Sequence, residues 1–196
     1  MASIEIRTEL VPPGPQLNTH RDELWRVLEW TDHDFVPPLS VRQPTTLGKL
    51  KPSRVAFDLP IEHLEFLLGL NVMFAYVNNR VVGFLSFLDD FRHETLPSDD
   101  PCVLIDTVAV VPAHRRHGVA RALYRALFAT AVFQAHDNAV LHTWSTNRPH
   151  GELIEALGFQ VIKRIPNERG PGIDTLIYLR PTKPSPFDAD DIPGKV

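Results

Sequence analysis

The 196-residue sequence contains a single cysteine, Cys102, and no long hydrophobic run. One cysteine excludes an internal disulfide and leaves too few thiolates for a structural zinc site. The longest mostly apolar stretch, residues 66–77, is far shorter than the roughly 20 residues that cross a bilayer. Residues 1–10 lack the apolar segment of a signal peptide. These absences predict a cytoplasmic protein without a membrane partner.

The sequence also lacks an excess of positive charge. Its 20 Lys and Arg residues against 24 Asp and Glu residues give a net charge of −4, which argues against a nucleic-acid partner. The patterns GxGxxG, GxSxG, HExxH and the P-loop pattern GxxxxGK are all absent, which excludes several common phosphate and hydrolytic sites. Hydrophobic residues make up 43% and charged residues 22%, values typical of one folded domain.

Proline, in contrast, is frequent at 18 residues and separates the predicted elements. Period-two alternation predicts a first strand over residues 3–9, and Asn78-Asn79 predicts a hairpin turn. Helical spacing predicts one helix from Thr19, a second helix capped by Asp58 and ended by Gly69, and further helices over residues 117–130 and 152–157. Further strands are predicted over residues 72–77, 81–88, 103–111, 139–146, 159–165 and 173–179.

This order of elements predicts an α/β fold with a mixed, α+β type sheet and helices on both faces. We expect residues 1–180 to form a single domain and residues 181–196, rich in proline and aspartate, to form an extended tail. Residues 31–58 are irregular, and a connection of that length is typical of a binding lid or a poorly ordered loop.

A buried strand, a basic turn and a helix start follow one another over residues 103–121. The start of a helix offers unpaired N–H groups and a partial positive charge, which together favour phosphate. Gly118 and Ala120 are small enough to let a diphosphate approach the backbone, and three arginines of this segment add positive charge. The residues alone therefore predict an anion-binding turn.

This segment resembles the acetyl-CoA-binding motif of the GCN5-related N-acetyltransferases (GNAT), in which Arg or Gln is followed by two variable residues, Gly, one variable residue, and Gly or Ala. Arg115, Gly118 and Ala120 occupy the fixed positions. Other matches are Gly83, the strand of residues 105–110, Asn147 and Leu157-Gly158-Phe159. The resemblance covers about residues 70–180 and implies a GNAT-like fold, whose central, mostly antiparallel sheet has about seven strands with one splayed parallel pair.

The resemblance further implies direct transfer of an acetyl group from acetyl-CoA to a primary amine, with no metal. The backbone of Val108 and Val110 would hold the pantetheine arm, and the Val110 N–H would polarise the thioester carbonyl. The implied cofactor-binding residues are Val108, Ala109, Val110, Arg115, Arg116, His117, Gly118, Val119, Ala120, Arg121 and Asn147. The alternatives are an acyl-CoA-binding regulatory module with little or no catalysis, and transfer to a hydroxyl group.

Asp106 and His142 are the predicted catalytic residues. Asp106 would remove the proton of the amine; the alternative is a buried carboxylate that only accepts hydrogen bonds. His142 would relay that proton, with a satisfied core histidine as the alternative. The tyrosine that the family places before Leu-Gly-Phe is Ile154 here, which leaves the general acid unassigned. His150 is expected at the surface, and Tyr124 is expected to pack.

The acceptor site is expected between residues 31–60, the loop of residues 89–100 and the hairpin of residues 167–172. Five acidic residues in that loop favour a cationic acceptor by electrostatic complementarity, although a solvated loop explains them equally well. A polyamine, an aminoglycoside-like molecule and a peptide amine all stay open as acceptors. Many members of the family dimerise through their sheets, so the resemblance also admits a homodimer.

Overall fold

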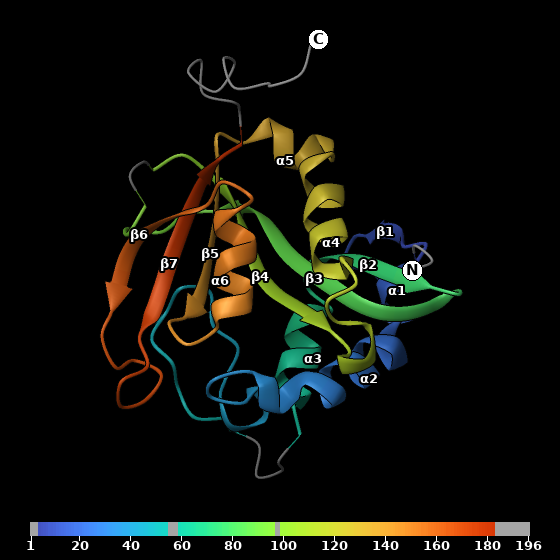
Figure 1. Cartoon of the computed structure of the whole chain (residues 1–196), viewed down its shortest axis with the longest axis horizontal. Helices are drawn as coiled ribbons and strands as arrows, with labels where there is room; N and C mark the ends of the chain where they lie inside the picture. The colour runs from blue at the N-terminus through green and yellow to red at the C-terminus, as the bar shows by residue number, and fades with distance from the viewer. Residues whose placement is uncertain (1–3, 55–58, 97–98, 183–196) are drawn as a thin grey trace.

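The computed structural model (Figure 1) describes residues 4–54, 59–96 and 99–182. Its strands are β1 (Arg7–Val11), β2 (Asn71–Val77), β3 (Arg80–Phe91), β4 (Cys102–Val110), β5 (Asn138–Trp144), β6 (Gln160–Ile165) and β7 (Thr175–Pro181). They form one seven-stranded sheet in the order β1-β2-β3-β4-β5-β7-β6. The β4–β5 pair is parallel, and the other neighbouring pairs are antiparallel. The predicted mixed sheet is confirmed.

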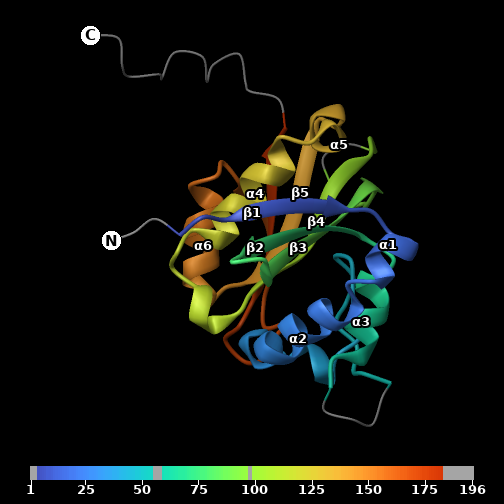
Figure 2. The same cartoon turned by 90° about the vertical axis from the view of Figure 1, so that its right-hand side faces the viewer.

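Helices cover both faces of this sheet, as Figure 2 shows. One face carries α4 (Val119–Phe128), α5 (Ala131–Ala135) and α6 (Arg148–Glu155), and the other carries α1 (Pro15–Asn18), α2 (Arg21–Thr31) and α3 (Ile61–Leu67). Alternation along β2 feeds both layers, because Met73 and Ala75 join the core under α4 while Val72 and Phe74 join the core under α2. The predicted two-sided packing of helices is therefore confirmed.

The predicted hairpin is confirmed, whereas the first strand lies later than predicted. Asn78 and Asn79 have φ values of 50° and 59°, the left-handed pair that a tight two-residue turn needs. Strand β1 spans Arg7–Val11 because antiparallel pairing with β2 determines its limits. Residues 89 and 90, expected in a loop, extend β3. Asp58, the expected helix cap, lies outside the described residues.

Two predicted helices each have a short neighbour that was not predicted. The helix expected from Thr19 is α2, which begins at Arg21, and the short helix α1 ends at Asn18, before the predicted start. The helix expected over residues 117–130 ends at Phe128, and Thr130 caps α5 by accepting a hydrogen bond from the Phe133 N–H at 3.1 Å. The expected tail begins within the fold, because Pro181 ends β7 and the Thr182 N–H donates to the Asp137 carbonyl at 2.9 Å.

Strand β4 contains a β-bulge at Asp106. Ser86 of β3 pairs with Thr107 and the next residue, Phe87, pairs with Ile105, so Asp106 has no partner on β3. Bulges often occur beside active sites, where they redirect a side chain. This bulge also changes which side chains face the α4 layer: Val103 and Ile105 do so before it, and Val108 and Val110 after it.

Gly83 is required where β3 meets the end of β4. A Cβ atom at this position would lie 2.6 Å from the Ala109 carbonyl oxygen and 3.2 Å from the Val110 Cα. Gly83→Ala should therefore force the strands apart and lower the free energy of unfolding by about 1–3 kcal/mol, measured by urea denaturation. Gly151→Ala is the matched control, since its Cβ would meet nothing closer than the Tyr178 hydroxyl at 3.7 Å. Because Gly151 is helical, its substitution should leave stability unchanged or raise it; equal losses would refute the explanation.

Candidate active site

The parallel strands β4 and β5 separate where the candidate site begins. Their ladder has three pairs and ends at Ile105 opposite Leu141, and Figure 1 shows the strands diverging beyond that point. A cleft of about 810 Å³ occupies this divergence. Its walls combine the end of β4, the turn before α4, the end of β5 and the start of α6 with residues 31, 34 and 35.

The free edge of β4 directs backbone N–H groups into this cleft. The Thr107 N–H donates to the Ser86 hydroxyl at 3.2 Å, and the Val111 N–H donates to the Val82 carbonyl at 2.9 Å, both on β3. Successive N–H groups of a strand point to opposite sides. The N–H groups of Val108 and Val110 therefore face away from β3, toward the cleft that their residues line.

The turn between β4 and α4 presents a second row of backbone donors. Arg116 and Gly118 have φ values of 64° and 84°, and Gly118 is the N-cap of α4 without a side-chain cap. Within the described residues, the N–H groups of residues 116–121 donate no hydrogen bond. A helix start with free donors and a positive dipole end is suited to a phosphate group.

The side chain of Arg115 holds this turn in place. Its Nε donates to the Val110 carbonyl at 2.9 Å, and its guanidinium forms an ion pair with Asp34. Arg115 therefore holds the end of β4 to the 3-10 helix η1 (Asp32–Asp34), in addition to lining the cleft. The sequence suggested only a contribution of positive charge to the diphosphate.

The cleft brings together twelve of the thirteen predicted site residues. His117, the thirteenth, is exposed and does not line it. Asn147 lines it and is also the N-cap of α6, with its amide donating to the Thr143 hydroxyl at 3.3 Å. The predicted residues in the cleft are Asp106, Val108, Ala109, Val110, Arg115, Arg116, Gly118, Val119, Ala120, Arg121, His142 and Asn147.

Asp106 lies where the cleft meets a second, smaller cavity of about 30 Å³. Burial raises the pKa of Asp106 to about 6, although the Thr107 hydrogen bond and the positive charge of Arg42 oppose this shift. The Thr107 hydroxyl donates to the carboxylate at 2.8 Å. At neutral pH Asp106 is thus a carboxylate with raised basicity, as a proton acceptor requires.

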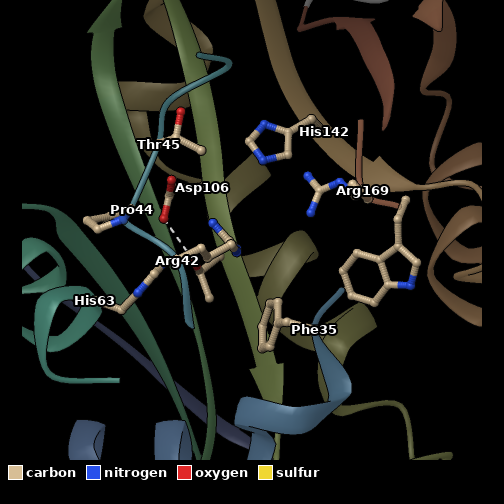
Figure 3. A pocket seen from close by; sticks show the side chains of 10 residues that line it. Phe35, Arg42, Pro44, Thr45, His63, Asp106, His142 and Arg169 are labelled. Carbon is tan, nitrogen blue, oxygen red and sulfur yellow. Dashed lines mark hydrogen bonds between the residues drawn. The ribbon is translucent and has the colours of Figure 1, made fainter. Parts of the chain in front are cut away.

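His142 faces Asp106 across the small cavity, as Figure 3 shows. It also lines the cleft, and burial lowers its pKa to about 3, with help from the charges of Arg169 and Arg42. Its Nδ1 is buried, and no described residue bonds to it. His142 is therefore a neutral imidazole whose Nδ1 has no partner among the described residues.

Ile154 occupies the position of the usual tyrosine, and it cannot serve as a general acid. Ile154 is fully buried in the core and does not line the cleft. His150 does line the cleft, contrary to the expected surface position, because α6 turns it inward onto Tyr124. The Tyr124 hydroxyl lies 2.9 Å from His150 Nε2, and the Thr143 hydroxyl lies 3.3 Å from His150 Nδ1. Burial lowers the pKa of His150 to about 4 and raises that of Tyr124.

The sequence did not identify three residues that line the small cavity: Arg42, His63 and Arg169. The segments that carry Arg42 and Arg169 were predicted to lie near the acceptor. A charged side chain in a proline-rich loop or a hairpin turn normally indicates solvent, however, and no local pattern shows that these two point inward. Both arginines are 7% exposed and His63 is 4% exposed.

The buried histidines predict a fold that is sensitive to acid. Burial lowers the pKa of His63 and His142 to about 3 and that of His150 to about 4, from an ordinary value of 6.5. The unfolded chain takes up these protons first, so stability is present above pH 6.5 and falls as the pH drops. The raised pKa of Asp106 has the opposite effect on stability between about pH 6 and pH 3.8. The three histidines outweigh this single carboxyl group. We expect a lower urea midpoint at pH 5 than at pH 7.

Each of these histidines should contribute a slope of at most about 1.4 kcal/mol per pH unit. His63→Asn should therefore flatten the dependence of the unfolding free energy on pH. His33→Asn is the control, because the His33 side chain is 83% exposed and the slope should not change. A slope that is the same in both variants and in the original protein would contradict the assignment.

A cleft of this kind, with a free strand edge leading to a helix start, is suited to an extended ligand that ends in a phosphate group. The model of the acetyltransferase (GNAT) family matches residues 24–159, well over half of the chain. The chain therefore belongs to the GNAT family of acetyltransferases. A comparison with curated proteins gives no match. No helix in the described part of the chain is long and apolar enough to cross a membrane.

Solved structures share the fold. The yncA protein of Salmonella typhimurium, solved with its cofactor acetyl-CoA, has a TM-score of 0.59 at 19% identity, over 91% of this chain and 96% of its own. The ribosomal-protein-S18-alanine N-acetyltransferase of Escherichia coli has a TM-score of 0.59 at 15% identity, over 95% and 99%. The aminoglycoside 6'-N-acetyltransferase of Enterococcus faecium has a TM-score of 0.62 at 13% identity, over 91% and 99%.

Proposed function

We propose that the protein transfers the acetyl group of acetyl-CoA directly to the primary amine of a small molecule or peptide. One observation carries the proposal: a single cleft joins the free N–H groups of Val108 and Val110, the unbonded N–H groups of residues 116 and 118–121, and the carboxylate of Asp106. The first two sets suit a thioester arm and a diphosphate, and the third suits removal of a proton.

Coenzyme A would lie along the cleft, with its diphosphate on the start of α4 and its pantetheine arm along the edge of β4. The Val110 N–H would then donate to the thioester oxygen, where negative charge develops during attack. The Val110 carbonyl already accepts a hydrogen bond from Arg115, which holds this part of the strand in place. The backbone donors require no rearrangement at the moment of reaction.

Asp106 would act as the base. An alkylammonium has a pKa near ~10.4, so the amine must lose a proton before its lone pair can attack the carbonyl carbon. The raised pKa of Asp106 makes it a stronger base than an exposed carboxylate while leaving it ionised at neutral pH. His142, neutral and with an unused Nδ1 across the small cavity, would pass the proton toward solvent.

The leaving group would depart as the thiolate. Thiols have a pKa near ~8.5, which makes them far better leaving groups than an amine or an alkoxide. His150, in the first turn of α6, is neutral, and the hydroxyl groups of Tyr124 and Thr143 lie within hydrogen-bonding distance of its two nitrogens. We therefore assign no general acid, in keeping with Ile154 at the usual tyrosine position.

The test is a thiol-release assay with acetyl-CoA and a panel of amines, combined with mass spectrometry of the products. The proposal expects equal amounts of free coenzyme A and of an amide product that is stable to mild base. An ester product, lost in mild base, would move the assignment to a hydroxyl acceptor. Tight binding of coenzyme A without turnover on any amine would instead support the acyl-CoA-binding module.

A further inference from the structure

The small cavity beside the cleft contains more positive than negative charge. Arg42, Arg169 and Asp106 are the charged residues that line it, and each arginine is 7% exposed. Among the described residues, neither arginine forms an ion pair. Asp32 and Glu168 influence them from outside the cavity, and Asp32 already accepts two hydrogen bonds from Ser40. Burial of an uncompensated charge is costly, so the cavity suits an anion.

The chain holds both guanidinium groups in defined orientations. Arg169 donates through Nε to the Thr175 hydroxyl at 3.0 Å and through Nη1 to the Val36 carbonyl at 2.8 Å. Arg42 donates through Nε to the Pro37 carbonyl at 3.3 Å. In the described part of the chain, the Nη2 group of neither arginine has a hydrogen-bond partner. Planar groups fixed in this way match the two oxygen atoms of a carboxylate.

Two neutral rings add unused nitrogen atoms to the same cavity. Neither nitrogen of His63, and not Nδ1 of His142, bonds to any described residue, although all three atoms are buried. Buried polar atoms are nearly always hydrogen-bonded, so unpaired ones that line a cavity indicate a ligand. Figure 3 shows His142, Arg42 and Arg169 directed toward the space beside Asp106. That space, about 30 Å³, fits a group of two oxygen atoms, since one water needs roughly 10–15 Å³.

We propose that the acceptor is an amino acid, an amine with a carboxylate on the neighbouring carbon, whose carboxylate binds in this cavity between Arg42 and Arg169. Because Asp106 lines both cavities, an amine one carbon away from that carboxylate faces Asp106 and the acetyl site. The amine nitrogen forms the new bond to the carbonyl carbon, its proton goes to Asp106, and the C–S bond breaks to release the thiolate. The inference rests on the proposed function and names its substrate class.

The acidic loop does not oppose this assignment. Its five carboxylates are exposed and line neither the cleft nor the small cavity. Their charge therefore lies outside the space where the acceptor would bind. The charge that the buried arginines place beside Asp106 outweighs that of a solvated loop, because low dielectric surroundings strengthen electrostatic interactions.

The first experiment compares amino acids with their amides as acceptors. The two compounds share the amine and differ in the charged carboxylate, and the amide's amine is the less basic and so the more often unprotonated. We expect kcat/KM to favour the acid by at least about 30-fold. A preference for the amide, or equal values, would overturn the inference while leaving acetyl transfer to amines intact.

The second experiment repeats the comparison with Arg169→Gln and Arg42→Gln. Each should lower the ratio of acid to amide by about 10-fold or more, and the ratio is internal to each preparation. Affinity for coenzyme A, measured by calorimetry, should persist and shows that the variant is folded. Arg180→Gln is the matched control: this part-buried guanidinium stacks on the Phe128 ring at 4.1 Å, outside both cavities, and its loss should leave the ratio unchanged.

Absence of turnover with every amine would refute the proposed function, and calorimetry then tests the carboxylate site by itself. The complex with coenzyme A is titrated with amino acids and with their amides. Binding of the acids that Arg169→Gln weakens supports the site. Binding of neither, or equal binding of both, overturns it.

Discussion

Gly118→Glu should lower the affinity for coenzyme A by at least about 100-fold, or roughly 2.7 kcal/mol. Three effects act together at this position. The φ value of 84° strains any residue with a side chain, the added bulk occupies the entrance of the α4 start, and the carboxylate repels the diphosphate. Isothermal titration calorimetry with coenzyme A measures the loss.

The matched control is Gly172→Glu. Gly172 has a similar φ of 74°, and at both glycines a Cβ would meet no atom within 4 Å, but Gly172 lies outside the cleft. Its substitution carries the same backbone strain, and affinity for coenzyme A should not change. If the two variants bind coenzyme A equally well, the start of α4 is not the diphosphate site.

Asp106→Asn should lower kcat/KM by about 10²–10⁴-fold, the usual contribution of a general base. Asparagine keeps the size of the side chain and an acceptor for the Thr107 hydroxyl, but it cannot take up a proton at neutral pH. The acid limb of the pH profile of kcat/KM, expected near pH 6, should disappear. Steady-state rates between pH 5 and 9 provide both readouts.

Stability separates this role from a structural one. Because the folded protein raises the pKa of Asp106, its ionised form is disfavoured in the fold, and stability is lost as the pH rises through about 6. Asp106→Asn should therefore be at least as stable as the original protein at pH 8. Asp32→Asn is the control: Asp32 is buried and bonded to Ser40, so the variant should lose stability but keep the acid limb. An unchanged pH profile in Asp106→Asn would remove Asp106 from the catalytic role.

Much of the fold could be predicted from the sequence because local signals encode it. The asparagine pair specifies the hairpin, and the apolar run before the basic turn specifies the buried strand β4. The limits of β1 and the start of α5 depend on long-range pairing and on single capping residues such as Thr130. Patterns of hydrophobicity contain neither kind of information.

The candidate site divides in the same way. The turn around Gly118 is contiguous in the sequence and is therefore visible as a motif. The small cavity is assembled from side chains distant in sequence, among them Arg42, Asp106 and Arg169. Its unusual feature is the burial of arginines, which depends on how the long connection after α2 and the β6–β7 hairpin close over the sheet. No local pattern specifies that closure.

The bulge at Asp106 shifts by one residue the alternation of β4 side chains between the two faces of the sheet. Odd-numbered side chains face the α4 layer before the bulge and even-numbered side chains face it afterwards, which keeps Val108 and Val110 in register with the cleft. Insertion or deletion of one residue between the bulge and Val110 would exchange the inward and outward sets, whereas a change of two residues would preserve them. Length variation in this strand is therefore tolerable only in even steps.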